Sequence, residues 1–223
     1  MCSCYRDTDK FIQSHKNDIL FVYLSTDTVL ADGVSTILIT AKINTNADFK
    51  TVQFFTTNSN FLNGTNTYSV SAAAQNNSLM ANAYLKSPND TTSFETVTVS
   101  ASGVDTVIKI FFYNAYPDSI HLGSSLASIQ NGFNNTLPIQ AYLIRRIGSA
   151  SRHQGAAFYA YKDDNSNIGA FQYLSLTGSD STGLINAIFQ LRDTSYTGRV
   201  RIVGTCNGGS RILQDTLTIF ITK

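Results

Sequence analysis

Three histidines are the first residues to consider for catalysis, because histidine is the commonest base beside a nucleophile. His15 lies in a polar N-terminal stretch, His121 follows Pro117 closely, and His153 lies in a polar loop. None of them falls in a recognisable motif, and the sequence contains neither a G-x-S-x-G elbow nor a glycine-rich phosphate loop. We interpret all three as solvent-exposed bystanders, assign no catalytic residue, and predict that the chain is not an enzyme.

The segment 163–169 (DDNSNIG) places oxygen-bearing side chains at alternate positions, which suits a hard cation such as calcium. Its candidate ligands are Asp163, Asn165 and Asn167. Ile168 stands where a calcium loop of the EF-hand type needs glycine, and no carboxylate closes the loop downstream. A hairpin turn is therefore the favoured interpretation, and we predict no metal and no cofactor.

The three cysteines, Cys2, Cys4 and Cys206, cannot form a disulfide framework for two domains, because two of them crowd one terminus. Cys206 ends an alternating apolar run and is predicted to be a small buried residue. Cys2 and Cys4 have no second Cys or His pair nearby, so the spacing does not predict a zinc site.

Aromatic side chains make up 11% of the sequence and could form stacking platforms for a glycan. Tyr159 and Tyr161 are the candidates, because they share one face of a predicted strand. The chain lacks tryptophan, the residue most used for sugar stacking, and packing of the rings in a core is the alternative. A separate basic cluster could form a small positive patch, with a solvated loop as the default interpretation; its residues are Arg145, Arg146, Arg152 and His153.

The composition excludes several classes of partner and favours β-structure. Charged residues are 14% of the chain, below the roughly 25% of an average soluble domain, and Ser, Thr and Asn supply the polar surface instead. A net charge of +1 gives no electrostatic attraction for nucleic acid or an anionic membrane. Glu95 is the only glutamate, which argues against salt-bridged helices and against a carboxylate pair for glycoside hydrolysis.

Short apolar or alternating runs, separated by turn sequences about every ten residues, predict an all-β sandwich. In 34–43, the face that carries Ile37, Ile39, Ala41 and Ile43 is predicted to point into the core. The strands predicted in the first half are 19–24, 34–43, 51–57, 79–86, 94–101 and 104–113.

The second half of the chain repeats the first at an offset of 100 to 110 residues, in the same order throughout. A repeat of this period predicts two tandem immunoglobulin-like β-sandwich domains rather than a solenoid. The corresponding segments are 39–43 and 139–143, 51–55 and 155–159, 78–87 and 183–192, 96–99 and 199–202, and 105–108 and 215–218. We expect a tether at 1–18, a first domain at 19–114 and a second at 115–223. A weak helical pattern at 122–130 could equally be a loop.

The first copy resembles the bacterial immunoglobulin-like domain of the invasin and intimin family, often called the Big-1 type. Segment 30–36 (LADGVST) and the strand after it match that family's ADG-x-S/T turn and first long strand. Three later segments resemble its later strands: 52–57 (VQFFTT), 78–87 (SLMANAYLKS, with Ser78 where glycine is usual) and 96–101 (TVTVSA). The resemblance covers about 22–112. The second copy, about 116–222, lacks the ADG turn but keeps the run GLINA at 183–187.

The resemblance implies exposure at a bacterial cell surface, at the outer membrane or outside the cell. No apolar leader segment follows Met1, which fits either an intracellular protein or a mature or trimmed form with an added methionine. The resemblance favours the second interpretation. Cys2 or Cys4 is then the candidate lipid acceptor of a lipoprotein, with terminal cysteines of no role as the alternative.

A D-(S/T)-(aliphatic or T) pattern resembles the O-glycosylation site of exported Bacteroidetes proteins. Chance triplets in a threonine-rich chain are an equally weighted alternative. The hydroxyl residues in this pattern are Thr28, Thr91, Thr106, Ser119, Ser181 and Thr216. Sequons for N-glycosylation occur at Asn63, Asn76, Asn89 and Asn134, and they carry weight only in a eukaryotic secretory pathway.

Taken together, these features predict a non-catalytic surface module that serves adhesion or assembly. The alternative is a surface glycan-binding lipoprotein that uses an aromatic face of the second domain. The expected partners are a protein or a glycan at the cell surface, or other subunits of a larger surface assembly, and no nucleic acid. A membrane is expected to be contacted only through the N-terminal lipid anchor.

Overall fold

The computed structural model describes residues 19–45, 50–75, 78–91, 94–101, 103–133 and 135–223, and it divides the chain into two compact units. Unit 1 is Met1–Tyr113 and unit 2 is Asn114–Lys223. Every element of the described residues is a β-strand, which confirms the all-β prediction. Within the same ranges, no helix has the length and apolar character needed to cross a bilayer. The expected tether at 1–18 lies outside the described residues.

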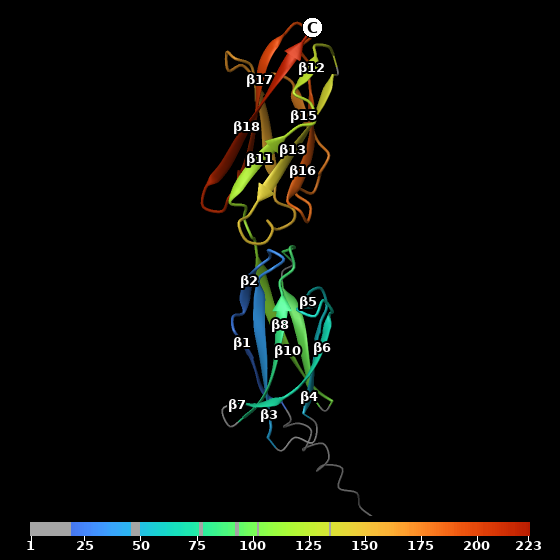
Figure 1. The fold of residues 1–223 in the computed structure, drawn as a ribbon, viewed down its shortest axis with the longest axis vertical. Helices are drawn as coiled ribbons and strands as arrows, with labels where there is room; N and C mark the ends of the chain where they lie inside the picture. The colour runs from blue at the N-terminus through green and yellow to red at the C-terminus, as the bar shows by residue number, and fades with distance from the viewer. Residues whose placement is uncertain (1–18, 46–49, 76–77, 92–93, 102, 134) are drawn as a thin grey trace, which may run out of the picture. The chain divides into compact units, whose positions relative to one another are not determined.

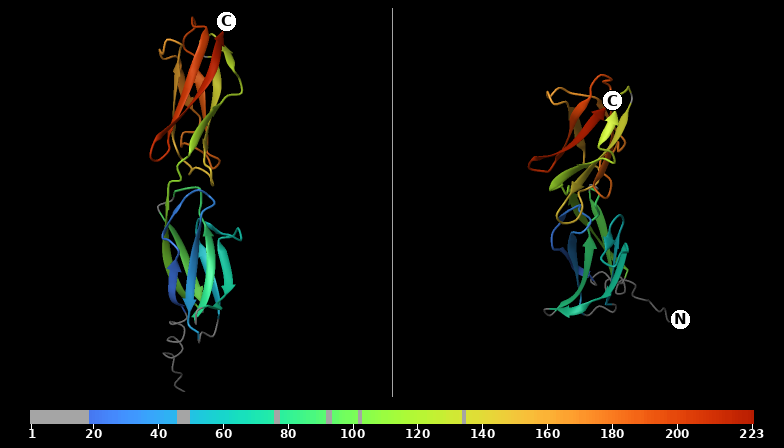
Figure 2. Two further views of the ribbon diagram at one scale, coloured as in Figure 1. Left: turned by 60° about the vertical axis from the view of Figure 1, so that its left-hand side comes forward. Right: turned by 45° about the horizontal axis from the view of Figure 1, so that its top comes forward.

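Unit 1 is built from two sheets packed face to face, which the views in Figures 1 and 2 show as two layers. The first sheet has the order β1 (Ile19–Leu24), β3 (Thr36–Ile43), β8 (Ser78–Lys86) and β5 (Asn60–Phe61), and β7 (Ala73–Gln75) also pairs with β8. The second has the order β2 (Thr28–Leu30), β10 (Val104–Tyr113), β9 (Glu95–Ala101), β4 (Thr51–Thr56) and β6 (Thr67–Ser71).

The strands of unit 1 form because apolar residues alternate with polar ones, so that each strand buries one face between the sheets. In β3, Ile37, Ile39, Ala41 and Ile43 are all buried, which confirms the predicted core face. In β10 only the C-terminal half reaches full burial, and Val107 is exposed to solvent.

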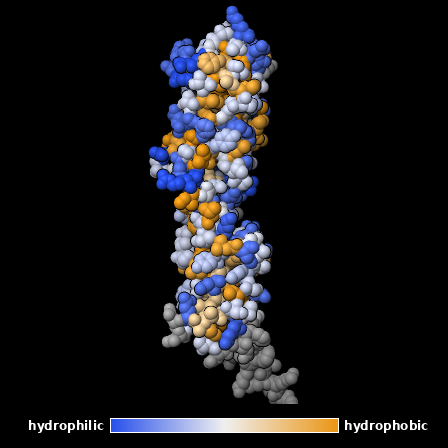
Figure 3. Space-filling view, viewed as in Figure 1, coloured by the Kyte–Doolittle hydropathy of each residue, from blue (hydrophilic) through white to orange (hydrophobic). Residues whose placement is uncertain are grey.

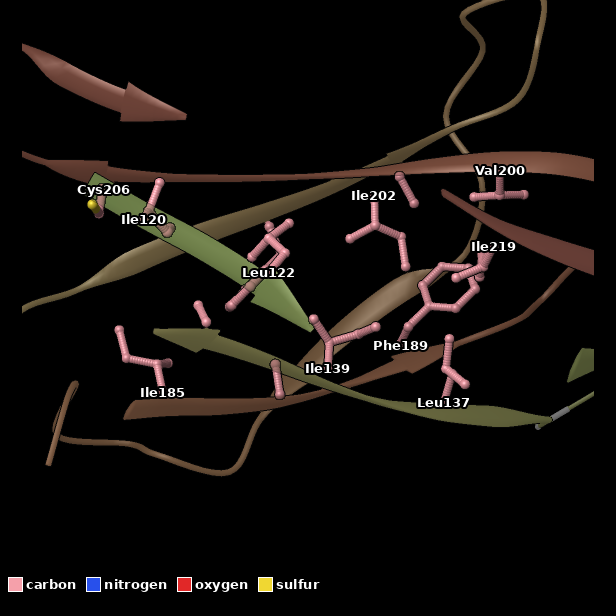
Figure 4. Close-up of a cluster of buried hydrophobic side chains, with 14 of the residues drawn as sticks. Ile120, Leu122, Leu137, Ile139, Ile185, Phe189, Val200, Ile202, Cys206 and Ile219 are labelled. Carbon is pink, nitrogen blue, oxygen red and sulfur yellow. The ribbon is translucent and has the colours of Figure 1, made fainter. Parts of the chain in front are cut away.

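Unit 2 repeats this arrangement. One sheet has the order β11 (Ser119–Gly123), β13 (Thr136–Ile144), β16 (Leu184–Gln190) and β15 (Ala170–Tyr173). The other has the order β12 (Ser128–Gln130), β18 (Ile212–Thr222), β17 (Gly198–Asn207) and β14 (Ala156–Tyr161). Figure 4 shows side chains of both sheets meeting between the layers, with Leu122 and Ile139 on one side and Ile202 and Ile219 on the other.

Cys206 belongs to this core. It is a free thiol, 5% exposed, at the end of the alternating pattern of β17. The prediction that it is a small buried residue is therefore confirmed. Burial raises the pKa of the Cys206 thiol, because the charged thiolate is poorly solvated there.

The internal repeat of the sequence is a repeat of topology. In unit 1 the sheet orders contain β1-β3-β8 and β2-β10-β9-β4, and in unit 2 they contain β11-β13-β16 and β12-β18-β17-β14. In both units the short strand, β2 or β12, pairs in parallel with the last strand. Even a cross-strand pair recurs: the Thr40 hydroxyl donates to Asn82 (2.8 Å), and the Gln140 amide donates to Asn186 (3.2 Å).

The helix considered for 122–130 is wrong, and the loop alternative holds only for 124–127. Its start belongs to β11, in which Ile120 and Leu122 are buried at alternate positions, and its end is β12. The backbone amide of Leu122 donates to the Asp215 carboxylate (2.7 Å), a partner 93 positions away that the local pattern cannot reveal.

Candidate functional site

The outer face of β14 carries the two tyrosines that the sequence singled out. Tyr159 is 49% exposed, and Tyr161 is half-buried two positions further along the same face. Opposite them on β17 lie Val203 and Arg201, respectively. The structure thus brings both tyrosines together beside an arginine, on a face that is open to solvent.

A cavity of about 310 Å³ adjoins Tyr159, between β14 and β15, the edge strands of the two sheets of unit 2. Its lining includes Phe158, Phe171 and Tyr173. The Phe158 ring lies 5.6 Å from that of Phe171 and 5.7 Å from that of Tyr173, centroid to centroid. The Tyr173 hydroxyl accepts a hydrogen bond from the Phe158 amide (3.3 Å), which holds the tyrosine against the edge of β14.

Sequence reasoning missed Phe171 and Tyr173. Their alternation in 170–173 (AFQY) is a strand signal, but nothing local shows that β15 pairs with β16 and so faces the edge of β14.

The segment 163–169 forms a hairpin turn. The Lys162 amide donates to the Ser166 carbonyl (2.9 Å), and Asn167 forms a β-bridge with Tyr161. Arg199 donates to the Asp163 carboxylate (2.8 Å), and Arg201 hydrogen-bonds Asn165. Two of the three candidate ligands are therefore held by arginines on β17. In the described part of the chain, no group of three or more His, Cys, Asp or Glu residues could hold a metal ion.

Glu95, the only glutamate, is fully buried at the start of β9. Its Oε1 accepts hydrogen bonds from the Thr56 hydroxyl (2.6 Å), from the amide and hydroxyl of Thr57 (both 2.7 Å) and from the Asn58 amide (3.0 Å). Burial alone would raise the pKa of Glu95, but these donors outweigh it and lower the pKa below the ordinary value of 4.5. The carboxylate therefore holds the loop after β4 in place.

Asp32 does the same for the ADG turn. Its Oδ1 accepts from the Val34 and Ser35 amides (2.9 and 2.7 Å) and from the Ser87 hydroxyl (3.1 Å). Burial opposes ionisation, yet the hydrogen bonds from Ser35, Val34 and Ser87 lower the pKa of Asp32. Gly33 has φ +75°, a conformation that favours glycine. The turn delays the start of β3 to Thr36, two residues after the predicted start.

The described histidines and Arg145 lie in structural contacts. His121 is 3.3 Å from the Asp215 carboxylate, and His153 lies 3.0 Å from the Thr177 carbonyl through Nδ1. Arg145 hydrogen-bonds the Tyr116 and Ile147 carbonyls. His15 lies outside the described residues.

The hydroxyl residues of the O-glycosylation pattern occupy both units. Five of them are exposed: Thr28, Thr91, Ser119, Ser181 and Thr216. Thr106 is half-buried on the inner side of β10. The aspartates of three triplets have structural partners, because Asp118, Asp180 and Asp215 accept hydrogen bonds from backbone amides. Among the sequons, Asn63 closes an Asx turn on Thr65, and Asn76 and Asn134 lie outside the described residues, as do Cys2 and Cys4.

Solved structures of bacterial adhesins share this fold. The chain aligns with the Yersinia pseudotuberculosis adhesin InvE at a TM-score of 0.54 and 16% identity, over 90% of this chain and 58% of that one. It aligns with invasin, described as a bacterial integrin-binding protein, at a TM-score of 0.62 and 16% identity, over 90% of this chain and 38% of that one. No protein-family model and no curated protein sequence matches the chain.

At this identity the likeness establishes the fold. The chain has the fold of the invasin-type bacterial immunoglobulin-like domains, which confirms the resemblance first drawn from 22–112. It spans 58% and 38% of the length of these two structures.

Proposed function

We propose that this chain is a non-catalytic module of a bacterial cell surface, whose two immunoglobulin-like units present binding faces for adhesion or assembly. The observation that carries the proposal is the tandem repeat of one sandwich topology, in the fold of bacterial adhesin structures. A fold alone does not specify function, so the polar residues of the chain must also be considered.

Several hydrogen-bonded polar groups support a structural role. Glu95 and Asp32 hold turns, and Asp163 in the 163–169 turn pairs with Arg199 on β17. Apolar side chains break the polar surface in scattered patches on the face seen in Figure 3. Several of these exposed side chains are aromatic, and aromatic residues are enriched in protein-binding surfaces.

Surface exposure can be tested on intact cells of the source bacterium. We expect antibodies raised against the purified chain to label unpermeabilised cells, and external protease to remove the signal. Beads coated with the chain should adhere to surfaces that carry the natural partner, and soluble chain should compete. A signal seen only after permeabilisation would contradict the proposal.

The anchor is proposed to be a lipid on Cys2 or Cys4. Metabolic labelling with a palmitate analogue should mark the native protein, and Cys2→Ser combined with Cys4→Ser should abolish the label. Cys206→Ser is the matched control and should retain the label, because Cys206 is buried in unit 2.

A glycan is the second candidate partner, and the exposed ring of Tyr159 beside Tyr161 and Arg201 favours it. Aromatic faces stack on the apolar faces of sugars, and a guanidinium supplies directional donors. On a glycan array we expect saturable binding that Tyr159→Ala or Tyr161→Ala removes. Binding that persists in both variants would locate the glycan elsewhere.

A further inference from the structure

The two units differ at one sheet edge. In unit 1, β6 pairs antiparallel with the outer edge of β4 over five residue pairs, from Thr51–Ser71 to Phe55–Thr67. In unit 2, β14 holds the place of β4 next to β17, and it ends the sheet order. Figure 1 shows β6 along the side of unit 1.

The backbone groups on the outer edge of β14 can be identified from their partners. The Ala160 carbonyl accepts from the Ile168 amide (3.0 Å), and the Phe158 amide donates to the Tyr173 hydroxyl (3.3 Å). Both N–H and C=O of one residue point to the same side of a strand. The amide of Ala160 and the carbonyl of Phe158 therefore also point away from β17.

Among the described residues, backbone hydrogen bonds of this chain reach the edge near its two ends, and between them the Tyr173 hydroxyl meets the Phe158 amide. Before β14, the Gln154 carbonyl accepts from the Ser179 amide (2.9 Å). At the C-terminal end of β14, the hairpin joins Ala160 to Ile168, Tyr161 to Asn167 and Lys162 to Ser166. The stretch 155–159 lies between these contacts, and it equals in length the stretch of β4 that β6 covers.

The 310 Å³ cavity adjoins the C-terminal end of this stretch, where Phe158 and Tyr159 line it. The Tyr173 hydroxyl occupies the position in which the carbonyl of a neighbouring strand would accept from the Phe158 amide. In unit 1, Tyr68 and Val70 of β6 point inward at alternate positions and pack against the core. The cavity offers Phe158, Phe171 and Ile168 to side chains placed in the same way.

We propose that the outer edge of β14 binds an extended peptide segment of a protein partner, antiparallel to β14, with alternate apolar side chains in the cavity. Exposed strand edges recruit strands through main-chain hydrogen bonds, and pockets for alternate side chains give specificity. The peptide of the partner would occupy, at the edge of β14, the place that β6 occupies at the edge of β4 in unit 1. This inference names a partner class for the adhesive role proposed above.

The probe is a fluorescent peptide of residues 66–72 (NTYSVSA), added to the purified chain and followed by anisotropy. We expect saturable binding, and slower amide exchange at Phe158 in the complex. The matched control peptide carries Tyr68→Lys and Val70→Lys and should not bind. No saturation at millimolar peptide, or protection elsewhere in the chain, would overturn the proposal.

The Tyr173→Phe variant distinguishes peptide binding from sugar binding. The variant removes the hydroxyl that competes for the Phe158 amide, so peptide affinity should rise by about 3- to 10-fold, the equivalent of one net hydrogen bond. Tyr161→Ala, which lies outside the cavity lining, should leave peptide affinity unchanged. A cooperative thermal unfolding transition is the check that both variants fold. Unchanged or weaker peptide affinity in Tyr173→Phe, or displacement of the peptide by a glycan that stacks in the cavity, would overturn the proposal. The assay uses purified chain, so its failure would leave the intact-cell test of surface exposure unaffected.

Discussion

The single glutamate of the chain illustrates how a charge is tolerated inside a β-sandwich. A buried carboxylate is costly unless donors replace the water that it loses. Glu95 receives four hydrogen bonds on one oxygen from Thr56, Thr57 and Asn58, so the loop and the charge depend on each other. The sequence marks Glu95 by its rarity and by its place on the apolar face of 94–101, but not by its partners.

Glu95→Gln should lower the free energy of unfolding of unit 1 by about 1–3 kcal/mol, because a neutral amide oxygen is a weaker acceptor for these four donors than a carboxylate oxygen. Urea unfolding of the full chain, with amide exchange as the probe of unit 1, measures this loss of stability. Asp105→Asn is the matched control, since Asp105 is exposed on β10, and it should change the stability by less than about 0.5 kcal/mol. Equal losses in the two variants would contradict the role assigned to Glu95.

Unit 1 should lose stability in acid. The folded pKa values of Glu95 and Asp32 lie below their ordinary values of 4.5 and 3.8, so the unfolded chain binds more protons as the pH falls through this range. The stabilisation is complete above these ordinary values and is lost as the pH falls through the lower, folded values. Urea midpoints between pH 6 and pH 2 measure it, and Glu95→Gln should flatten the dependence. A urea midpoint of unit 1 that stays constant down to pH 2 would contradict this prediction.

At the scale of elements, a strand begins where the backbone before it can turn. Gly183, which precedes β16, has φ +82°, and a Cβ there would lie 2.5 Å from the Leu143 carbonyl oxygen. The glycine of the GLINA run is therefore required by geometry. Ser78 stands at the corresponding place in unit 1 and lies within β8 itself.

Gly183→Ala should destabilise unit 2 by about 1–3 kcal/mol, because it adds a clash to a conformation that alanine rarely adopts. Gly155→Ala is the matched control in the same unit, since a Cβ there meets nothing within 4 Å. Thermal unfolding of the two variants distinguishes them. A Gly183→Ala protein as stable as Gly155→Ala would show that the turn relaxes easily.

Strand prediction succeeded where alternation is long and failed where pairing is short. The six runs predicted in the first half correspond to β1, β3, β4, β8, β9 and β10. The short strands β2, β5 and β7 were missed, because two or three residues carry too little periodicity. β6 was also missed, since its five residues stay exposed or half-buried.

At the scale of the whole molecule, the described residues form two separate hydrophobic cores. Ile39 belongs to the core of unit 1, and Ile139 belongs to the core of unit 2. Both side chains are fully buried and occupy corresponding places in β3 and β13. They therefore form a matched pair for testing whether each unit folds by itself.

Ile39→Ala should destabilise unit 1 by about 2–5 kcal/mol and leave unit 2 unchanged, and Ile139→Ala should do the reverse. The reason is that each substitution opens a cavity in one core only. Hydrogen exchange measured amide by amide reports the stability of both units in one experiment. Equal loss of protection in both units from either variant would show that they unfold together.

The sequence by itself determined the all-β class, the order of the long strands, the internal repeat and the buried state of Cys206. These features follow from alternation of side chains along a strand, which is local in the chain. Only the tertiary structure decided the partners of Glu95 and Asp215, and the cavity where Tyr173 meets Phe158. Those features join residues that are distant in sequence, and their positions depend on which strands become neighbours when two sheets pack.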